Sequence, residues 1–169
     1  MIVCVDVDYR ASGAVAACVG IRSWPDAIPC YESVLRSSEE AAPYIPSMLF
    51  LREMPLILGI LEPMTDVELL VVDGYVWLAK NRPGLGARLF EHQAGRFPVV
   101  GVAKRAFFGN DCAVQVLRGR STRPLYVTAV GIDAAHAAEC VVQMAGNNRL
   151  PTILKRADSL ARGTGSMDG

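Results

Sequence analysis

The sequence predicts an α/β fold in which helices flank a mixed β-sheet. Three short β-branched runs come first, and helical and strand patterns alternate after them, an order typical of this class. Two of the later strand candidates are apolar runs, as strands buried on both faces are. Hydrophobic residues make up 51% of the 169 residues, so the chain can bury a full core. We therefore expect a single domain over residues 1–162, followed by a flexible tail at residues 163–169.

The first part of the chain predicts an antiparallel meander of three strands. Residues 1–8 alternate and are β-branched, residues 14–21 form a second apolar run, and residues 30–35 form a weaker third one. Short turn segments separate these runs, so neighbouring strands can pair in antiparallel fashion. Residues 37–46 are polar and flanked by proline, which predicts a loop.

Helices and strands alternate from residue 50 onward. Residues 50–61 carry leucine and methionine at helical spacing, and Pro63 closes that helix. Residues 68–72, which are apolar after Glu68, and residues 98–103 predict two buried strands. The other predicted elements are strands at 113–118 and 125–129 and helices at 85–93, 133–145 and 152–162.

Cysteine usage and the lengths of the apolar runs favour a cytoplasmic protein. The five cysteines show no CxxC spacing, which suits reduced thiols better than a disulfide framework. No apolar run is long enough to span a bilayer. The first residues carry an early charge and no basic region, so no signal peptide is expected.

The charges are distributed unevenly along the chain. Residues 1–79 hold four arginines against eleven acids, and residues 80–169 hold thirteen lysines and arginines against six acids. An acidic half can gather a cation, and a basic half can face an anion such as a phosphate backbone. On composition alone, ordinary surface charge that happens to be segregated remains the favoured interpretation.

Four charged residues stand at chemically informative positions. Asp6 lies inside an apolar strand, where a carboxylate is costly unless it has a partner such as a metal ion. Asp73 and Lys104 each follow a buried strand, and ligands of α/β sheets gather beyond such carboxyl ends. Glu53, near the start of a helix, can add a third carboxylate to a Mg²⁺ or Mn²⁺ site. Each has an ordinary alternative, because an acid at a strand end often caps a turn and a lone lysine is often solvated.

Taken in order, these residues lie in segments that resemble the endonuclease V (deoxyinosine 3′ endonuclease) family. The segments are Val-Asp-Val-Asp-Tyr at 5–9, Pro-Tyr-Ile-Pro-Ser-Met-Leu-Phe-Leu-Arg-Glu at 43–53, Val-Asp-Gly at 72–74 and Gly-Val-Ala-Lys at 101–104. The stretch from Arg149 to Arg162 also looks like the end of that family. The resemblance covers about residues 1–162 and implies a ribonuclease H-like fold, here in a compact and divergent member.

The resemblance implies a role for each candidate residue. Asp6 and Asp73 would hold the metal ion with Glu53, and Lys104 would stabilise charge near the scissile phosphate. The substrate would be DNA or RNA that contains a deaminated base, deoxyinosine or inosine. The residues expected to contact nucleic acid are the wedge of Tyr44, Ile45 and Pro46, an apolar insertion beside the lesion, and the cations Arg82 and Arg105.

The chain also departs from the family pattern. Residues 73–82 contain neither of the two histidines that the family usually has after the second aspartate. After Gly131, where the family carries another site residue, Asp133 is the nearest ligand-type side chain, and it can serve as a helix cap or as a metal ligand. An alternative function is therefore a catalytically weak nucleic-acid-binding relative that lost hypoxanthine recognition. The pair Phe107-Phe108 belongs either to the core or to a surface that stacks on a base.

Overall fold

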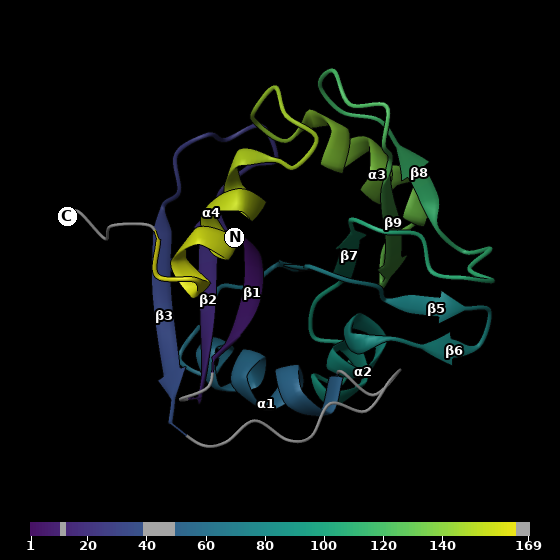
Figure 1. The fold of residues 1–169 in the computed structure, drawn as a ribbon. Coiled ribbons are helices and arrows are strands. Elements are labelled where there is room, and N and C mark those ends of the chain that lie inside the picture. Colours follow the sequence, from purple (N-terminus) through teal and green to yellow (C-terminus); the bar gives the residue numbers. More distant parts are fainter. Residues whose placement is uncertain (11–12, 39–49, 165–169) are drawn as a thin grey trace.

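A seven-stranded mixed sheet forms the centre of the molecule (Figure 1). The computed structural model describes residues 1–10, 13–38 and 50–164. The strands of this sheet are β1 (Ile2–Arg10), β2 (Gly13–Ile21), β3 (Tyr31–Ser37), β4 (Leu69–Val72), β7 (Val99–Ala103), β8 (Val114–Val116) and β9 (Leu125–Val130). Their order across the sheet is β3-β2-β1-β4-β7-β9-β8. The β1–β4 and β4–β7 pairs are parallel, and the other neighbouring pairs are antiparallel.

Two pairs of helices cover the two faces of the sheet. The helices are α1 (Phe50–Leu61), α2 (Leu85–His92), α3 (Ala134–Gln143) and α4 (Thr152–Ala161). In Figure 1, α3 and α4 lie in the upper half of the view and α1 and α2 along its lower part. Each pair encloses its own hydrophobic cluster, because alternate strand residues face opposite sides. The predicted α/β fold, a mixed sheet flanked by helices, is confirmed.

One small element was not expected from the sequence. The strands β5 (Trp77–Ala79) and β6 (Arg82–Pro83) form a two-stranded hairpin outside the main sheet. Its turn consists of two residues, of which Asn81 has φ +62°, a left-handed conformation that asparagine tolerates. The hairpin lies between β4 and α2 in the chain and projects to the right in Figure 1.

The residues after α4 remain attached to its end as far as Thr164. The Gly163 amide donates to the Leu160 carbonyl, and the Thr164 amide donates to the Ser159 carbonyl. Residues 165–169 lie outside the described residues. The predicted domain over 1–162 and tail at 163–169 therefore stay a prediction.

Two further findings bear on the expected cellular setting. Within the described ranges, no helix is both long enough and apolar enough to cross a membrane. The five cysteines of the chain are all free thiols. The cytoplasmic location inferred from the sequence stays a prediction.

The segment between α3 and α4 is held by a buried arginine. Arg118, which is 5% exposed, donates to the carbonyls of Gly146 and Asn148 at 3.2 and 3.0 Å and also to the carbonyl of Met144. These carbonyls lie beyond the regular hydrogen-bond ladder of a helix, so they need other donors. One guanidinium therefore satisfies several carbonyls of this segment and helps to set where α4 begins.

We predict that Arg118→Met lowers the free energy of unfolding by about 2–4 kcal/mol, because several carbonyls lose their donor in a buried place. Urea denaturation is the measurement. Arg120→Met, which alters an exposed arginine two residues away, is the matched control and should change stability by less than about 0.5 kcal/mol. Equal effects of the two substitutions would contradict the role given to Arg118.

Candidate functional site

Three strands bring charged residues to the same edge of the sheet. β1 and β4 run parallel with Val5 opposite Val72, so the next residues, Asp6 and Asp73, lie level with each other. β7 runs parallel to β4, and Lys104 follows its last residue at this same edge. The carboxyl ends of parallel strands therefore gather two carboxylates and one ammonium group, as the sequence predicted.

Strand alternation also decides which face these side chains share. Cys4 of β1 and Val71 of β4 belong to the hydrophobic cluster beneath α3 and α4. Side chains two positions apart point to the same side of a strand. Asp6 and Asp73 therefore continue the face that α4 covers, at the point where the apolar core ends.

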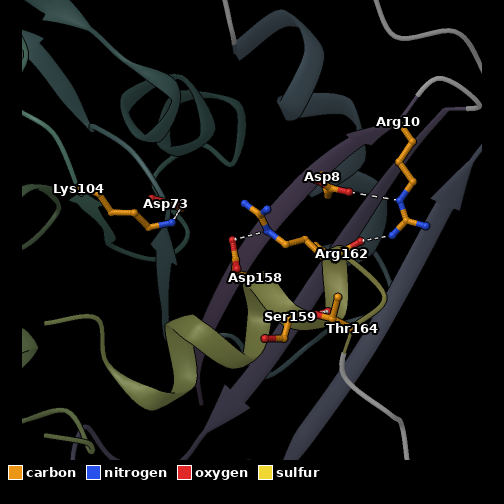
Figure 2. Close-up of polar contacts among 9 residues, drawn as sticks. Asp8, Arg10, Asp73, Lys104, Asp158, Ser159, Arg162 and Thr164 are labelled. Carbon is orange, nitrogen blue, oxygen red and sulfur yellow. Dashed lines mark hydrogen bonds and ion pairs between the residues drawn. The ribbon is translucent and has the colours of Figure 1, made fainter. Parts of the chain in front are cut away.

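Lys104 is paired directly with Asp73. Its Nζ lies 2.6 Å from Asp73 Oδ2, and the two side chains are 36% and 31% exposed (Figure 2). Burial acts to lower the pKa of Lys104, but the hydrogen bond to Asp73 and the negative charges of Asp73, Asp6 and Asp158 outweigh it, so the pKa is raised. Lys104 therefore stays protonated and brings a fixed positive charge to this edge.

Asp6 and Glu53 both have strongly raised pKa values. Burial, reinforced by the charge of Asp73 and opposed by that of Lys104, raises the pKa of Asp6 to about 7. Glu53 stands in the first turn of α1, and burial together with the charges of Asp6 and Asp73 raises its pKa to about 8. The first turn of α1 thus brings a third carboxylate into the field of the other two. Such mutual repulsion in a partly buried place is typical of functional sites.

A fourth carboxylate, Asp158, belongs to this group and was not identified from the sequence. It lies on α4, and its negative charge raises the pKa of Asp6 and of Lys104. Figure 2 shows it between the Lys104–Asp73 pair and Arg162, whose Nε donates to Asp158 Oδ1 at 3.0 Å. A signal existed, because positions 154, 158 and 161 share one side of a helix and the other two are buried apolar residues. An acid flanked in this way adjoins the core instead of the solvent face.

Of the two roles that the sequence left open for Asp133, the structure shows the helix cap. Its side chain accepts a hydrogen bond from the His136 amide at 2.9 Å and caps α3, the alternative role considered for it. β9 runs antiparallel to β7, with Val130 opposite Val99, so the residues that follow β9 lie at the other edge of the sheet. The structure therefore does not bring Asp133 to the carboxylates.

A close backbone contact fixes the turn that carries Asp73. A Cβ on Gly101 would lie 2.5 Å from the Gly74 carbonyl oxygen and 2.7 Å from the Val76 nitrogen. The Val76 amide donates to Thr128 Oγ1 at 2.8 Å, which ties the same turn to β9. The glycine of the Gly-Val-Ala-Lys segment thus lets the turn after Asp73 lie directly on the sheet.

The predicted nucleic-acid contacts are only partly described. Tyr44, Ile45 and Pro46 fall outside the described residues. The Arg82 guanidinium lies 5.3 Å from the centre of the Phe107 ring, on the hairpin side of the loop that follows Lys104. Arg105 is exposed, and its carbonyl accepts a hydrogen bond from a tyrosine hydroxyl.

The chemistry of the carboxylates fits a hard divalent cation. All four candidate ligands offer oxygen atoms, the donors that Mg²⁺, Mn²⁺ and Ca²⁺ prefer, and a cation would offset the repulsion that raises the pKa of Asp6 and Glu53. In the part of the chain that the structure describes, no three Asp, Glu, His or Cys side chains are already arranged to hold a metal ion. The observed arrangement is thus a set of repelling carboxylates, one of them paired with Lys104.

Comparison with known proteins points to one family. Residues 1–120 match the family model described as Endonuclease V. The endonuclease V of Thermococcus kodakarensis is 33% identical over 168 residues, an alignment that covers 98% of this chain and 79% of that protein. The match thus extends beyond the individual motifs to almost the whole chain.

Solved structures give the same result at the level of the fold. The structure of human ENDOV superposes with a TM-score of 0.77 at 25% identity and covers 96% of this chain and 83% of that one. Endonuclease V of Ciona intestinalis, in complex with a 24-mer DNA containing an inosine followed by a ribo-adenosine, has a TM-score of 0.80 at 20% identity, covering 96% and 84%. The expected ribonuclease H-like fold is confirmed.

We predict that the metal-free protein loses stability as pH rises from about 4 to about 8. The native state keeps protons on Asp6 and Glu53 that the unfolded chain releases near pH 4, so the unfolded state binds fewer protons across this range. Asp6→Asn removes one of these groups and one cause of the raised pKa of Glu53, so its melting temperature should fall less steeply. Thermal unfolding in chelator is the measurement, with the exposed Asp66→Asn as the control. Identical slopes for wild type and Asp6→Asn would contradict the raised pKa values.

Proposed function

Because the chain belongs to the endonuclease V family, we propose that it is a metal-dependent endonuclease that hydrolyses a phosphodiester near a deaminated base. The observation that carries the proposal is the level placement of Asp6 and Asp73 beside Lys104 at one edge of the sheet. The base would be deoxyinosine in DNA or inosine in RNA. The complex of the Ciona intestinalis protein with inosine-containing DNA supports this substrate class.

In this mechanism Asp6, Asp73 and Glu53 hold the cation, and Asp158 joins them from α4. We assign Mg²⁺ to the site, with Mn²⁺ as a substitute, because carboxylate oxygens suit both ions. When bound, such an ion stabilises charge on a phosphoryl oxygen and lowers the pKa of a bound water. The carboxylates fix the position of the ion, and they bind it in their ionised form.

Lys104 has a separate task in the proposal. Its ammonium lies 2.6 Å from Asp73, which holds it at the edge where the phosphate would lie. A fixed positive charge there stabilises the negative charge that develops on the phosphate in the transition state. Because its pKa is raised, Lys104 serves as an electrostatic partner and not as a base.

Two groups of residues are proposed to recognise the substrate. Tyr44, Ile45 and Pro46 are proposed as an apolar wedge that enters the base stack beside the lesion. Arg82 and Arg105 are proposed to contact backbone phosphates, whose charges attract them without regard to sequence.

A second candidate function is favoured by one observation. Residues 73–82 contain no histidine, although the resemblance implies two histidines in this region. A relative that binds nucleic acid without cutting it efficiently would fit that difference. The retention of Asp6, Glu53 and Asp73 favours the nuclease, since a decayed site has no need of three carboxylates that repel one another.

We predict that the protein cleaves labelled oligonucleotides containing inosine in the presence of Mg²⁺ or Mn²⁺, but not in chelator. Asp73→Asn should abolish this cleavage and leave the melting temperature within a few degrees, because the side chain lies at a strand end. Asp66→Asn, on an exposed loop at the opposite edge, is the matched control and should cleave like wild type. The substrate panel includes uracil, abasic and undamaged strands in DNA and RNA.

Two results would contradict the nuclease. Cleavage that persists in Asp73→Asn would remove the metal site from the mechanism. Tight binding of all oligonucleotides without cleavage under either ion would favour the binding relative instead.

We predict that Asp158→Asn weakens Mn²⁺ affinity by about 10–100-fold, the scale on which loss of support for a metal site is usually felt. Asp158 also pairs with Arg162 at 3.0 Å, so a purely structural role within α4 is the alternative. Arg162→Ala breaks that pair without touching the carboxylate and separates the two roles. If Arg162→Ala and Asp158→Asn weaken Mn²⁺ binding equally, Asp158 is not a ligand.

A further inference from the structure

The loop between β7 and β8 presents an aromatic ring to solvent. Phe108 is 101% exposed, the largest value among the exposed large hydrophobic residues of the described chain. It lies four residues after Lys104, and its neighbour Phe107 is half-buried. Single exposed apolar side chains are common on proteins, so exposure alone assigns no role to Phe108.

The loop that carries this ring is tightly braced. Asn110 Oδ1 accepts hydrogen bonds from the amides of Cys112 and Ala113 at 2.9 and 3.0 Å. Asn110 Nδ2 donates to the Trp77 carbonyl at 2.7 Å, which ties the loop to the β5–β6 hairpin. The Asn110 amide closes a turn onto the Phe107 carbonyl at 3.0 Å. Phe108 is therefore held out on an ordered turn, and a partner that contacts it would lose little loop entropy.

An aromatic and cationic cluster lies beside the exposed ring. Phe107 packs edge-on against Tyr75, with ring centres 6.1 Å apart and an interplanar angle of 64°. The Arg82 guanidinium lies 5.3 Å from the Phe107 ring centre, and the Tyr75 hydroxyl donates to the Arg105 carbonyl at 2.7 Å. The surface next to the candidate site thus combines π faces with two positive charges.

We propose that Phe108 is a stacking surface for an unpaired nucleobase of the bound strand, with Arg82 and Arg105 contacting the phosphates on either side. This inference rests on the proposed function and adds a preference for single-stranded or locally opened nucleic acid. A ring that projects alone can cover a base only when that base has left its own stack. The neighbouring cations match a polyanion, which favours nucleic acid over an apolar protein partner.

The test compares the affinities of variants for undamaged nucleic acid in Mg²⁺, a substrate type that is not expected to be cut. Fluorescence anisotropy is measured with a labelled single strand and with a blunt duplex of the same sequence. Phe108→Ala should weaken single-strand binding by about 5–100-fold, the range found when a stacking aromatic is removed. Phe108→Trp should restore it, and duplex affinity should change less than about twofold, because the interior bases of a duplex are stacked on both faces.

Ile28→Ala is the matched control for loss of an exposed apolar side chain. Ile28 is 84% exposed and lies between β2 and β3, at the sheet edge opposite Asp6. It should bind both nucleic acids like wild type, and thermal unfolding should show that all variants keep their fold.

The outcomes separate the two proposals. If wild type binds neither nucleic acid, the stacking surface is refuted, while the proposed function is decided separately by cleavage of inosine-containing strands. If wild type binds but Phe108→Ala binds single strands equally well, or loses duplex affinity to the same extent, the stacking surface is refuted while the proposed function stands.

Discussion

Repulsion among carboxylates at one edge of the sheet is the constraint on which the rest of the structure depends. Asp6, Glu53, Asp73 and Asp158 come from two strands and two helices, and in the described chain Lys104 pairs with Asp73 and Arg162 pairs with Asp158. Burial and mutual repulsion raise the pKa of Asp6 and Glu53 to about 7 and 8. A fold selected for stability alone has no reason to bury such a set, whereas a site for a divalent cation requires it.

The surrounding structure holds this unfavourable arrangement in place. Parallel pairing of β1 with β4 keeps Asp6 and Asp73 level, and the backbone contact at Gly101 holds the turn after Asp73 against the sheet. On the other side, Arg118 fixes the segment that leads into α4, the helix that carries Asp158. The apolar core thus continues directly into the site, and rigid elements hold the charged groups that repel one another.

Much of this could be predicted from the sequence, for reasons that differ between elements. Strand alternation and apolar runs gave the main strands and helices, and a carboxylate inside or after an apolar strand marked Asp6 and Asp73. The β5–β6 hairpin was missed because strands of two and three residues have no measurable period. Asp133 was left open between a helix cap and a metal ligand, because chain order does not tell whether β9 runs parallel or antiparallel to β7. Asp158 was missed because an acid in an amphipathic helix is usually solvated, and its place beside Leu154 became informative only once α4 was seen to cover Asp6.

The most direct test of the carboxylate site is the number of protons released when Mn²⁺ binds. Titration calorimetry of the metal-free protein near pH 7, in two buffers of different ionisation enthalpy, gives this number. Near pH 7 Glu53 is mostly protonated and Asp6 about half protonated, and a cation displaces these protons, so we expect saturable binding with release of about one proton per ion. Absence of saturable binding, or binding without proton release, would contradict a metal site built from these carboxylates.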